Sequence, residues 1–396
     1  MAFSVSIEQA RQLLTRLVQC PSVNPAGRQS FEPPFGEGRI ARLLEELLRS
    51  WGAAVQVVEV KPGRPNVLAR FEGPAGAPTL MLECHSDTVS IEGMTVPPFD
   101  AAVRDGRLYG RGACDDKGPM AAMLLAIRGL LDEGELPVSV LFAATCGEEL
   151  GALGAKALVA SGAPPAKAVV VGEPTDMQIV HASKGVVRFR IETRGRAAHS
   201  SDPARGVNAI YQMRRVLDVL ESQVAPRLAQ QADPLLGPAT LSVGTICGGT
   251  QVNIVPDRCE ILVDRRTLPS EKLADVAAQV VGPLERLKEQ SPSFDFAAQY
   301  AEQFPPLLTD AQAPLARLVA QACRQTLGRG ELTVAPWASD AAVYAAAGME
   351  AVLLGPGSIR QAHTADEFIE LDAVARAAGT YAEIVRLYGE APEGGV

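Results

Sequence analysis

The chain has 396 residues, a formal net charge of −9, 47% hydrophobic residues and 21% charged residues. This length exceeds what one hydrophobic core usually organises, so we expect two domains or one domain with a large insertion. The negative charge and the lack of a long basic run argue against nucleic acid as a partner. Neither a membrane span nor a signal peptide is recognisable, so we expect a cytoplasmic protein.

The cysteines are odd in number, scattered and without paired spacing. This pattern argues against a disulfide framework and fits a reducing compartment. They are Cys20, Cys84, Cys114, Cys146, Cys247, Cys259 and Cys323.

Helical and strand patterns alternate through the first part of the chain. Ser6 and Gln9 form a capping-box pattern ahead of the first helix, and Pro119 suits the first turn of a later one. The alternation predicts an α/β fold with a mostly parallel sheet and helices on both faces. We expect helices at about 7–20, 39–51, 119–131 and 152–161, and strands at 55–60, 66–71, 79–84, 138–145 and 168–171.

The pattern changes near Ser183, where a half-exposed strand begins. About four strands and two helices follow, which predicts a compact two-layer α+β module that ends before Pro305 and Pro306. The strands are expected at 184–194, 239–246, 258–267 and 294–301, and the helices at 207–224 and 271–289. We therefore expect residues 184–303 to be an insertion in a discontinuous domain formed by residues 1–183 and 304–396.

Polar residues of metal-ligand type follow three of the expected strands, and one more follows a glycine-rich turn at Gly110 and Gly112. In open α/β sheets, ligand sites form outside the carboxyl ends of the strands, so these side chains should converge at one edge of the sheet. They are His85, Asp87, Asp115, Glu148, Glu149 and Glu173.

Carboxylate oxygens with one or two imidazoles suit zinc, and also cobalt or manganese. Of the successive glutamates Glu148 and Glu149, one can hold a metal while the other stays free as a base for water. Five ligands with one bridging carboxylate would hold two ions roughly 3.5–4 Å apart, as in two-metal hydrolases. Such a site lowers the pKa of bound water to about 7 and polarises a carbonyl, which is the chemistry of amide hydrolysis.

Five motifs occur in the order found in one known family. They are His85-Ser86-Asp87-Thr88, the run from Gly110 to Gly118, Glu148-Glu149, Gly172-Glu173-Pro174-Thr175 and Ala362-His363. The chain resembles, over nearly its whole length, the co-catalytic dizinc family of acetylornithine deacetylase, succinyl-diaminopimelate desuccinylase, aminoacylase and bacterial glutamate carboxypeptidase.

This resemblance implies a role for each motif residue. His85 and Glu173 would hold the first of two Zn²⁺ ions, with Co²⁺ or Mn²⁺ as alternatives. Glu149 and His363 would hold the second ion, and Asp115 would bridge the two. Asp87 would hydrogen-bond to His85, and Glu148 would be the general base that takes a proton from metal-bound water. The peptide bond between Asp115 and Asp116 should be cis.

The inserted module resembles the lid and dimerisation module of the same family. By this resemblance His199 would stabilise the oxyanion, and Asn253 and Arg266 would contact the substrate near its carboxylate. Arg265, the neighbour of Arg266, competes for that role because an arginine fork binds a carboxylate bidentately. The resemblance also implies a homodimer in which His199 reaches the active site of the partner.

Other residues of reactive type have simpler interpretations. His181 matches no ligand position and is expected to be structural. Asp340, after Ser339, is expected to be a helix N-cap. We interpret Cys84, Cys114 and Cys146 as small buried hydrophobic residues, although each lies beside a motif.

The leading hypothesis is a dizinc amidohydrolase that releases the acyl group of an N-acyl amino acid. A carboxypeptidase or dipeptidase with the same chemistry is the close alternative, and both need a free carboxylate on the substrate. A cysteine-nucleophile hydrolase built on Cys84 or Cys146 is an alternative of a different class. Retention of Glu148 argues against a metal-binding relative without catalysis. Asp115 stands where a dinucleotide fingerprint needs glycine, which disfavours nucleotide binding.

Overall fold

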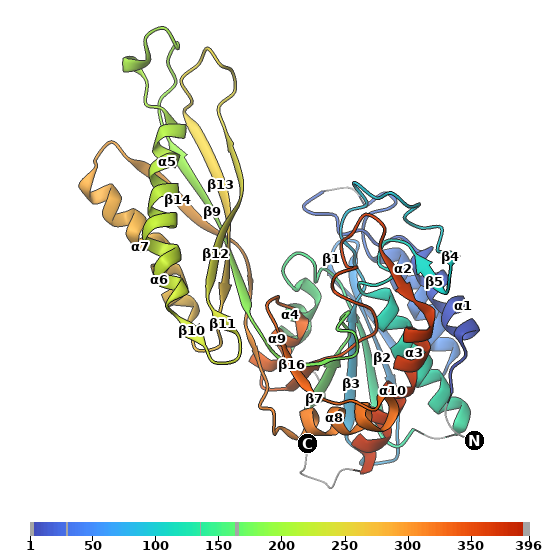
Figure 1. Ribbon diagram of the computed structural model, residues 1–396. Coiled ribbons are helices and arrows are strands. Elements are labelled where there is room, and N and C mark those ends of the chain that lie inside the picture. Colours follow the sequence, from blue (N-terminus) through green and yellow to red (C-terminus); the bar gives the residue numbers. More distant parts are fainter. Residues whose placement is uncertain (1–3, 29–30, 135, 163–165, 391–396) are drawn as a thin grey trace. The chain divides into compact units, whose positions relative to one another are not determined.

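The computed structural model describes residues 4–28, 31–134, 136–162 and 166–390. These residues form two compact units (Figure 1). The first unit contains the chain up to Ala182, Leu307–Val334 and the chain from Ser339 onward. The second contains Ser183–Pro306 and the short segment Ala335–Ala338. The first unit is therefore assembled from segments that lie on both sides of the second unit in the sequence.

A nine-stranded sheet organises the described part of the first unit, in the order β1-β2-β6-β3-β7-β17-β8-β15, with β16 paired to β8. The four central strands, β6, β3, β7 and β17, run parallel. Antiparallel strands flank them, β2 and β1 on one side and β8 on the other. The strands are β1 Ala54–Lys61, β2 Arg64–Phe71, β3 Thr79–His85, β6 Ser139–Thr145, β7 Ala168–Val171, β8 Ile179–Ser183, β15 Leu307–Leu308, β16 Leu332–Ala335 and β17 Glu350–Leu353.

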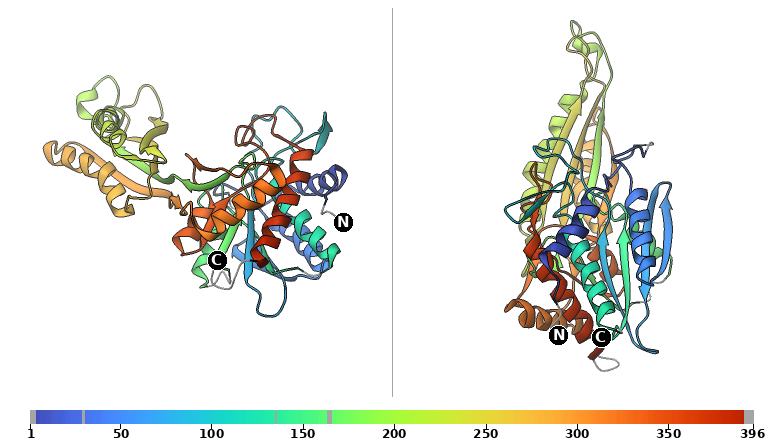
Figure 2. Two further views of the ribbon diagram at one scale, coloured as in Figure 1. Left: turned by 60° about the horizontal axis from the view of Figure 1, so that its bottom comes forward. Right: turned by 90° about the vertical axis from the view of Figure 1, so that its right-hand side faces the viewer.

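Helices cover both faces of this sheet. On one face, the helices share a hydrophobic core with strand residues such as Leu82 and Phe142. Helices α1, α3 and α10 lie side by side on this face (Figure 2). Helix α9 packs on the opposite face, where its first residue meets Thr145. The helices are α1 Ile7–Val18, α2 Gly38–Ser50, α3 Lys117–Glu133, α4 Leu153–Ala160, α8 Pro314–Leu327, α9 Asp340–Ala346 and α10 Leu371–Glu390.

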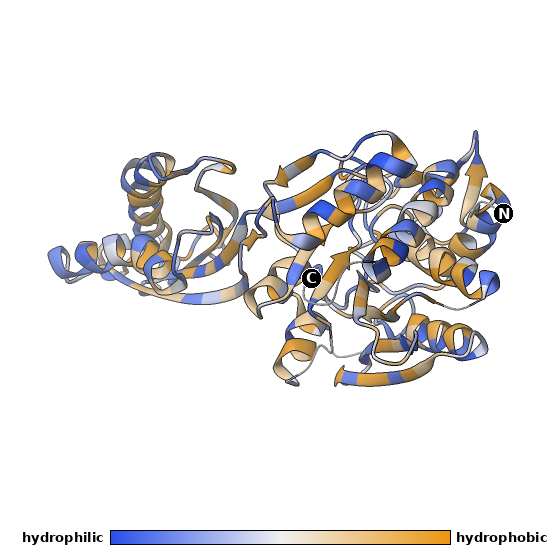
Figure 3. Ribbon diagram, turned by 90° about the horizontal axis from the view of Figure 1, so that it is seen from below, coloured by the Kyte–Doolittle hydropathy of each residue, from blue (hydrophilic) through white to orange (hydrophobic). Residues whose placement is uncertain are grey.

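The hydrophobic pattern explains this arrangement. Every residue of β6 and of β7 is buried, as expected for strands covered on both faces. The surrounding helices carry hydrophilic and hydrophobic residues in alternation along their length (Figure 3), and α2 buries Ile40, Leu44 and Leu48 on one stripe. The expected α/β class, with parallel strands at the centre, is confirmed. None of the described helices is both long enough and apolar enough to cross a membrane.

The local signal for the start of the first helix was also correct. Ser6 accepts a hydrogen bond from the main chain of Gln9, whose side chain in turn accepts one from the main chain of Ser6, so the predicted capping box is present. A small three-stranded sheet, which the sequence did not predict, joins two distant segments: β4 Ala102–Arg104, β5 Arg107–Tyr109 and β18 Phe368–Glu370. It brings the chain after His363 against the chain before Asp115.

The second unit is a two-layer α+β structure, as expected. Its antiparallel sheet has the order β12-β13-β9-β14. Buried and more exposed residues alternate along β9 and β13, because the helices cover only one face. Its longer elements are β9 Gly185–Arg194, α5 Ala209–Val219, a π-helical turn Leu220–Val224, α6 Ala225–Ala229, β12 Thr240–Gly248, β13 Arg258–Thr267, α7 Leu273–Gln290 and β14 Asp295–Phe304. Its short elements are the 3₁₀ turn Pro203–Arg205 and the hairpin of β10 Ala232–Asp233 with β11 Gly237–Pro238.

Candidate active site

The carboxyl ends of the four parallel strands carry the predicted metal ligands. His85 is the last residue of β3, Glu149 follows β6, Glu173 follows β7, and His363 lies in the loop after β17. Asp115 comes from the turn that precedes α3. Because parallel strands all end at the same edge of a sheet, five segments from distant parts of the sequence meet there.

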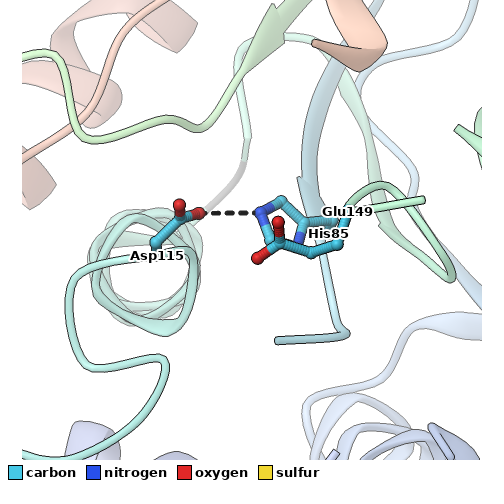
Figure 4. A group of neighbouring side chains, drawn as sticks. All are labelled: His85, Asp115 and Glu149. Carbon is cyan, nitrogen blue, oxygen red and sulfur yellow. Dashed lines mark hydrogen bonds and ion pairs between the residues drawn. The ribbon is translucent and has the colours of Figure 1, made fainter. Parts of the chain in front are cut away.

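Three of these residues form a compact group (Figure 4). The ligand atoms that His85, Asp115 and Glu149 can offer all lie within 4.8 Å of one another. His85 Nε2 lies 2.9 Å from Asp115 Oδ1. Burial alone would raise the pKa of Asp115, but hydrogen bonds from His363 and His85 hold this pKa below its usual range. Asp115 therefore stays ionised among its neighbours.

His363 closes this group from the far end of the sequence. Its Nε2 lies 3.3 Å from Asp115 Oδ2 and 3.1 Å from Glu149 Oε2. Hydrogen bonds to Asp115 and Glu149 raise the pKa of His363 to about 10. Its backbone is left-handed, with φ of 63°, a conformation unfavourable for a residue with a side chain. Contacts with the surrounding loop must therefore maintain this backbone conformation.

Asp87 contacts His85 mainly through its main chain. The carbonyl of Asp87 lies 3.0 Å from His85 Nδ1, whereas the nearest carboxylate oxygen lies 3.6 Å away. Since Nδ1 donates to this carbonyl, Nε2 is the ring nitrogen that can face a metal. The carboxylate instead accepts hydrogen bonds from the main-chain N–H of Glu148 at 3.0 Å and from Asn24 Nδ2 at 2.6 Å. Asp87 thus positions Glu148 as well as His85.

Glu148 and Glu173 are both buried beside the compact group. Burial raises the pKa of Glu148 well above its usual value, and the nearby acidic groups add to the effect. Burial also raises the pKa of Glu173, and the charges of Asp115 and Glu148 raise it further. So many carboxyl groups cannot be ionised together in a buried site unless cations are present.

The donor set therefore fits divalent metal ions. Buried carboxylate oxygens and two imidazole nitrogens are the ligands that zinc, cobalt or manganese accept. Positive charge at this position would relieve the repulsion among the acidic groups. The peptide bond between Asp115 and Asp116 is cis, as the resemblance implied.

Asp340 was expected to cap a helix, and this prediction is wrong. Ser339 occupies the N-cap position, while Asp340 is the first residue of α9. The Asp340 carboxyl group is buried and hydrogen-bonds to the Thr145 hydroxyl, which also hydrogen-bonds to Glu83. Burial raises the pKa of both carboxyl groups, and the charge of Asp340 raises that of Glu83 further. The first residue of α9 therefore packs against the sheet instead of facing solvent.

The cysteines beside the motifs are buried, as expected. Cys84, Cys114 and Cys146 have no exposed surface, and burial raises the pKa of each thiol. A nucleophilic cysteine needs an accessible thiol with a lowered pKa, so the cysteine-hydrolase alternative loses its support. His181 is also buried, and its Nδ1 donates to the carbonyl of Thr309 at 2.7 Å, in line with a structural role.

In the second unit, two of the predicted substrate-binding residues come from neighbouring loops. The main-chain N–H of Ser200, next to His199, donates to the carbonyl of Asn253 at 3.0 Å. Both His199 and Asn253 are exposed. Their loops lie together at one end of the unit (Figure 1).

Arg266 lies at the opposite end of β13 from these loops. Its guanidinium is partly exposed and pairs with Asp264 at 2.8 Å. Arg265 is fully buried, and its guanidinium is engaged by Glu271 and Gln279. Of the two arginines, only Arg266 is placed to meet a ligand from solvent.

Two residues of the first unit that organise the site were missed. Glu367 is fully buried and accepts hydrogen bonds from the main chain on both sides of Cys114, and Arg111 is its ion-pair partner. Arg111 belongs to the glycine-rich motif, but no local pattern marks Glu367 as a buried acid.

The fold and this donor set define a metal-dependent hydrolase. More particularly, the chain belongs to the peptidase family M20/M25/M40, whose model matches residues 81–387.

Individual relatives agree with this family. Acetylornithine deacetylase of Myxococcus xanthus is 32% identical over 313 residues, which are 78% of this chain and 80% of that protein. Acetylornithine deacetylase of Edwardsiella ictaluri is 34% identical over 354 residues, 85% of this chain and 87% of that protein. Among solved structures, the di-peptidase Dug1p from Saccharomyces cerevisiae matches 98% of this chain and 99% of its own, with a TM-score of 0.81. At 16% identity, that likeness concerns the fold alone.

Proposed function

We propose that this protein is a two-metal amidohydrolase that removes the acyl group from an N-acyl amino acid. The observation that carries the proposal is the convergence of His85, Asp115, Glu149 and His363 at one sheet edge. Glu148 is buried beside them, and its main chain is held by Asp87.

The contacts of Asp115 support a pair of metal ions. Its two oxygens face different histidines, Oδ1 toward His85 at 2.9 Å and Oδ2 toward His363 at 3.3 Å. A carboxylate that presents one oxygen to each side is suited to bridge two ions. We assign His85 and Glu173 to the first ion and Glu149 and His363 to the second. Zinc suits this mixture of nitrogen and oxygen ligands best, with cobalt and manganese as alternatives.

Bound divalent ions would polarise the scissile carbonyl and bring the pKa of water to about 7. In the proposed reaction, Glu148 receives the proton of the attacking water and passes it to the leaving amine. The hydrogen bond from its main chain to Asp87 fixes the position from which its side chain extends into the site.

We assign the substrate carboxylate to Arg266, whose fork can bind it bidentately. A deacylase is the leading candidate because the relatives at 32% and 34% identity are acetylornithine deacetylases. A carboxypeptidase or dipeptidase of the same chemistry remains the alternative.

The geometry of the second unit supports a homodimer in which His199 acts on the partner's substrate. Arg258, at one end of β13, follows the Asn253 loop, and Arg266 lies eight residues further along (266 − 258). At about 3.3 Å per residue, the two ends are roughly 26 Å apart. A small N-acyl amino acid cannot span that distance. His199 and Arg266 could therefore serve one substrate only if they come from different chains.

Metal analysis and turnover of Glu148→Gln test the proposal. The wild-type protein should bind two metal ions per chain and hydrolyse at least one member of a panel of N-acetyl, N-succinyl and dipeptide substrates. Glu148→Gln should keep both ions and lose about 10²–10⁴-fold in kcat, because the side chain is proposed as a proton carrier and not as a ligand. A variant that loses an ion, or that keeps near-normal kcat, would show that the base is misassigned.

A further inference from the structure

A buried carboxylate outside the ligand set holds the turn that carries Asp115. Glu367 Oε1 accepts hydrogen bonds from the main-chain N–H groups of Cys114 at 2.9 Å and Asp115 at 3.0 Å. Its Oε2 accepts from the main chain of Gly112 at 3.0 Å and from Arg111 Nη1 at 2.6 Å. Four donors thus converge on one side chain with no exposed surface.

Arg111 extends these contacts to two further loops. Its Nε donates to the carbonyl of Ser90 at 3.0 Å, in the loop that follows β3. Its Nη2 donates to the carbonyl of Thr364 at 3.3 Å, next to His363. Arg111 is only 2% exposed. One buried ion pair therefore connects the loops that carry Asp115 and His363.

These two loops need such support because regular structure does not hold them. Gly112 has φ of 82° and His363 has φ of 63°, both left-handed. Such a conformation is unfavourable for histidine, so contacts from outside the residue must maintain it. The other ligands differ in this respect. His85 is the last paired residue of β3, and Glu173 lies two residues beyond the end of β7, so the large sheet fixes the chain at both.

We propose that the Arg111–Glu367 pair is a positioning unit that acts mainly on the second metal ion. The inference rests on the two-metal site proposed above. Asp115 would bridge both ions, but His363 would serve the second ion alone. Disturbing the pair therefore misaligns two ligands of the second ion and one ligand of the first. The affinity for the second ion should fall more than the affinity for the first.

The substitution Glu367→Gln tests this with little change in size. A glutamine offers one acceptor oxygen, so its NH₂ group must face donors, either Arg111 and Gly112 or the main chain at Cys114 and Asp115. Glu370→Gln is a matched control three residues further along the chain, at the end of β18. Glu370 pairs with Arg107 at 3.4 Å on the exposed surface, so the same chemical change occurs there without the buried network.

The measurement is a zinc titration of metal-free protein against a competing chelator, which gives one dissociation constant for each ion. Wild type should bind two ions, and Glu370→Gln should bind both with the same dissociation constants as wild type. Glu367→Gln should bind the second ion about 10–100-fold more weakly than wild type does. Its affinity for the first ion should fall by less. A folding defect alone would lower the thermal stability of the metal-free protein without changing the ratio of the two constants.

Each other outcome is decisive. If wild type binds fewer than two ions, the proposed function fails before the inference is reached. If Glu367→Gln keeps both constants, or weakens both equally, the positioning role is overturned. If Glu367→Gln does not fold, Arg111→Lys takes its place, because lysine keeps the charge but cannot reach Ser90, Thr364 and Glu367 together. If Arg111→Lys is also unfolded, the pair serves the fold and the inference is wrong.

Discussion

Replacing Asp87 by Asn removes one acceptor from the centre of the site without changing the size of the side chain. The two carboxylate oxygens accept separate hydrogen bonds, from the main chain of Glu148 and from Asn24. An amide has only one acceptor oxygen, so one of these donors must face an NH₂ group whichever way the side chain is turned.

We expect the free energy of unfolding of the metal-free protein to fall by about 1.5–3 kcal/mol, the usual contribution of a hydrogen bond to a charged group. The Asp87 side chain has no exposed surface, so solvent does not screen the loss. Metal affinity should fall by only about tenfold, the lower end of the range for groups that support a ligand. The reason is that His85 Nδ1 donates to the main-chain carbonyl of Asp87, which the substitution keeps.

Urea unfolding of metal-free protein and zinc titration measure the two effects separately. Asp132→Asn is the control, because Asp132 pairs with Arg128 on the exposed surface of α3. An unchanged free energy of unfolding in Asp87→Asn would refute the hydrogen-bond argument. A loss of metal as complete as that of His85→Ala would show that the carboxylate, and not the carbonyl, holds the ring.

Four further predictions concern His363 and the second unit. Arg266→Ala should lower kcat/KM roughly tenfold to more than a hundredfold for a substrate with a free carboxylate, and only slightly for the corresponding amide. An equal decrease for both substrates would contradict the assignment of the substrate carboxylate to Arg266. In metal-free protein the NMR titration of His363 should have a midpoint near pH 10. Because this pKa is higher than that of an unfolded histidine, protonation of His363 stabilises the fold. The stabilisation is complete below about pH 6.5 and is lost as the pH rises through 10. Zinc binding must displace the proton from the His363 ring. At pH 8, calorimetry should therefore show that zinc binding releases about one proton fewer from His363→Ala than from wild type. Mixed dimers of Glu148→Ala and His199→Ala should regain activity if His199 works in trans, whereas a well-mixed sample as inactive as its parents would exclude this.

Sequence reasoning located most of the candidate site because the relevant rule is local. A residue just after a buried strand lies at the sheet edge whatever the rest of the chain does, and this applies to His85, Glu149 and Glu173. Strand limits such as Ala168–Val171 could be predicted for the same reason. His363 follows β17 only after a long loop, so it was found through family resemblance and not through its local pattern.

The failures concern groups whose partners are distant in sequence. Asp340 follows a serine before a short helix, which looks like a cap, but its partner is Thr145, 195 residues away (340 − 145). Glu367 follows an aspartate and precedes a phenylalanine, and nothing nearby indicates four donors from residues 111–115. Burial of a charge is decided by what packs around it, which a local pattern does not contain.

The position of β17 has a consequence for synthesis of the chain. This strand pairs with β7 in the large sheet, yet 179 residues separate Val171 from Glu350 (350 − 171). At about 5–20 residues per second, a ribosome needs on the order of ten to forty seconds to deliver β17 after β7. Through that interval the apolar edge of β7 lacks its neighbour on that side and can pair with strands of other nascent chains. We expect nascent chains that end before Glu350 to be the species most prone to aggregate and to need chaperones.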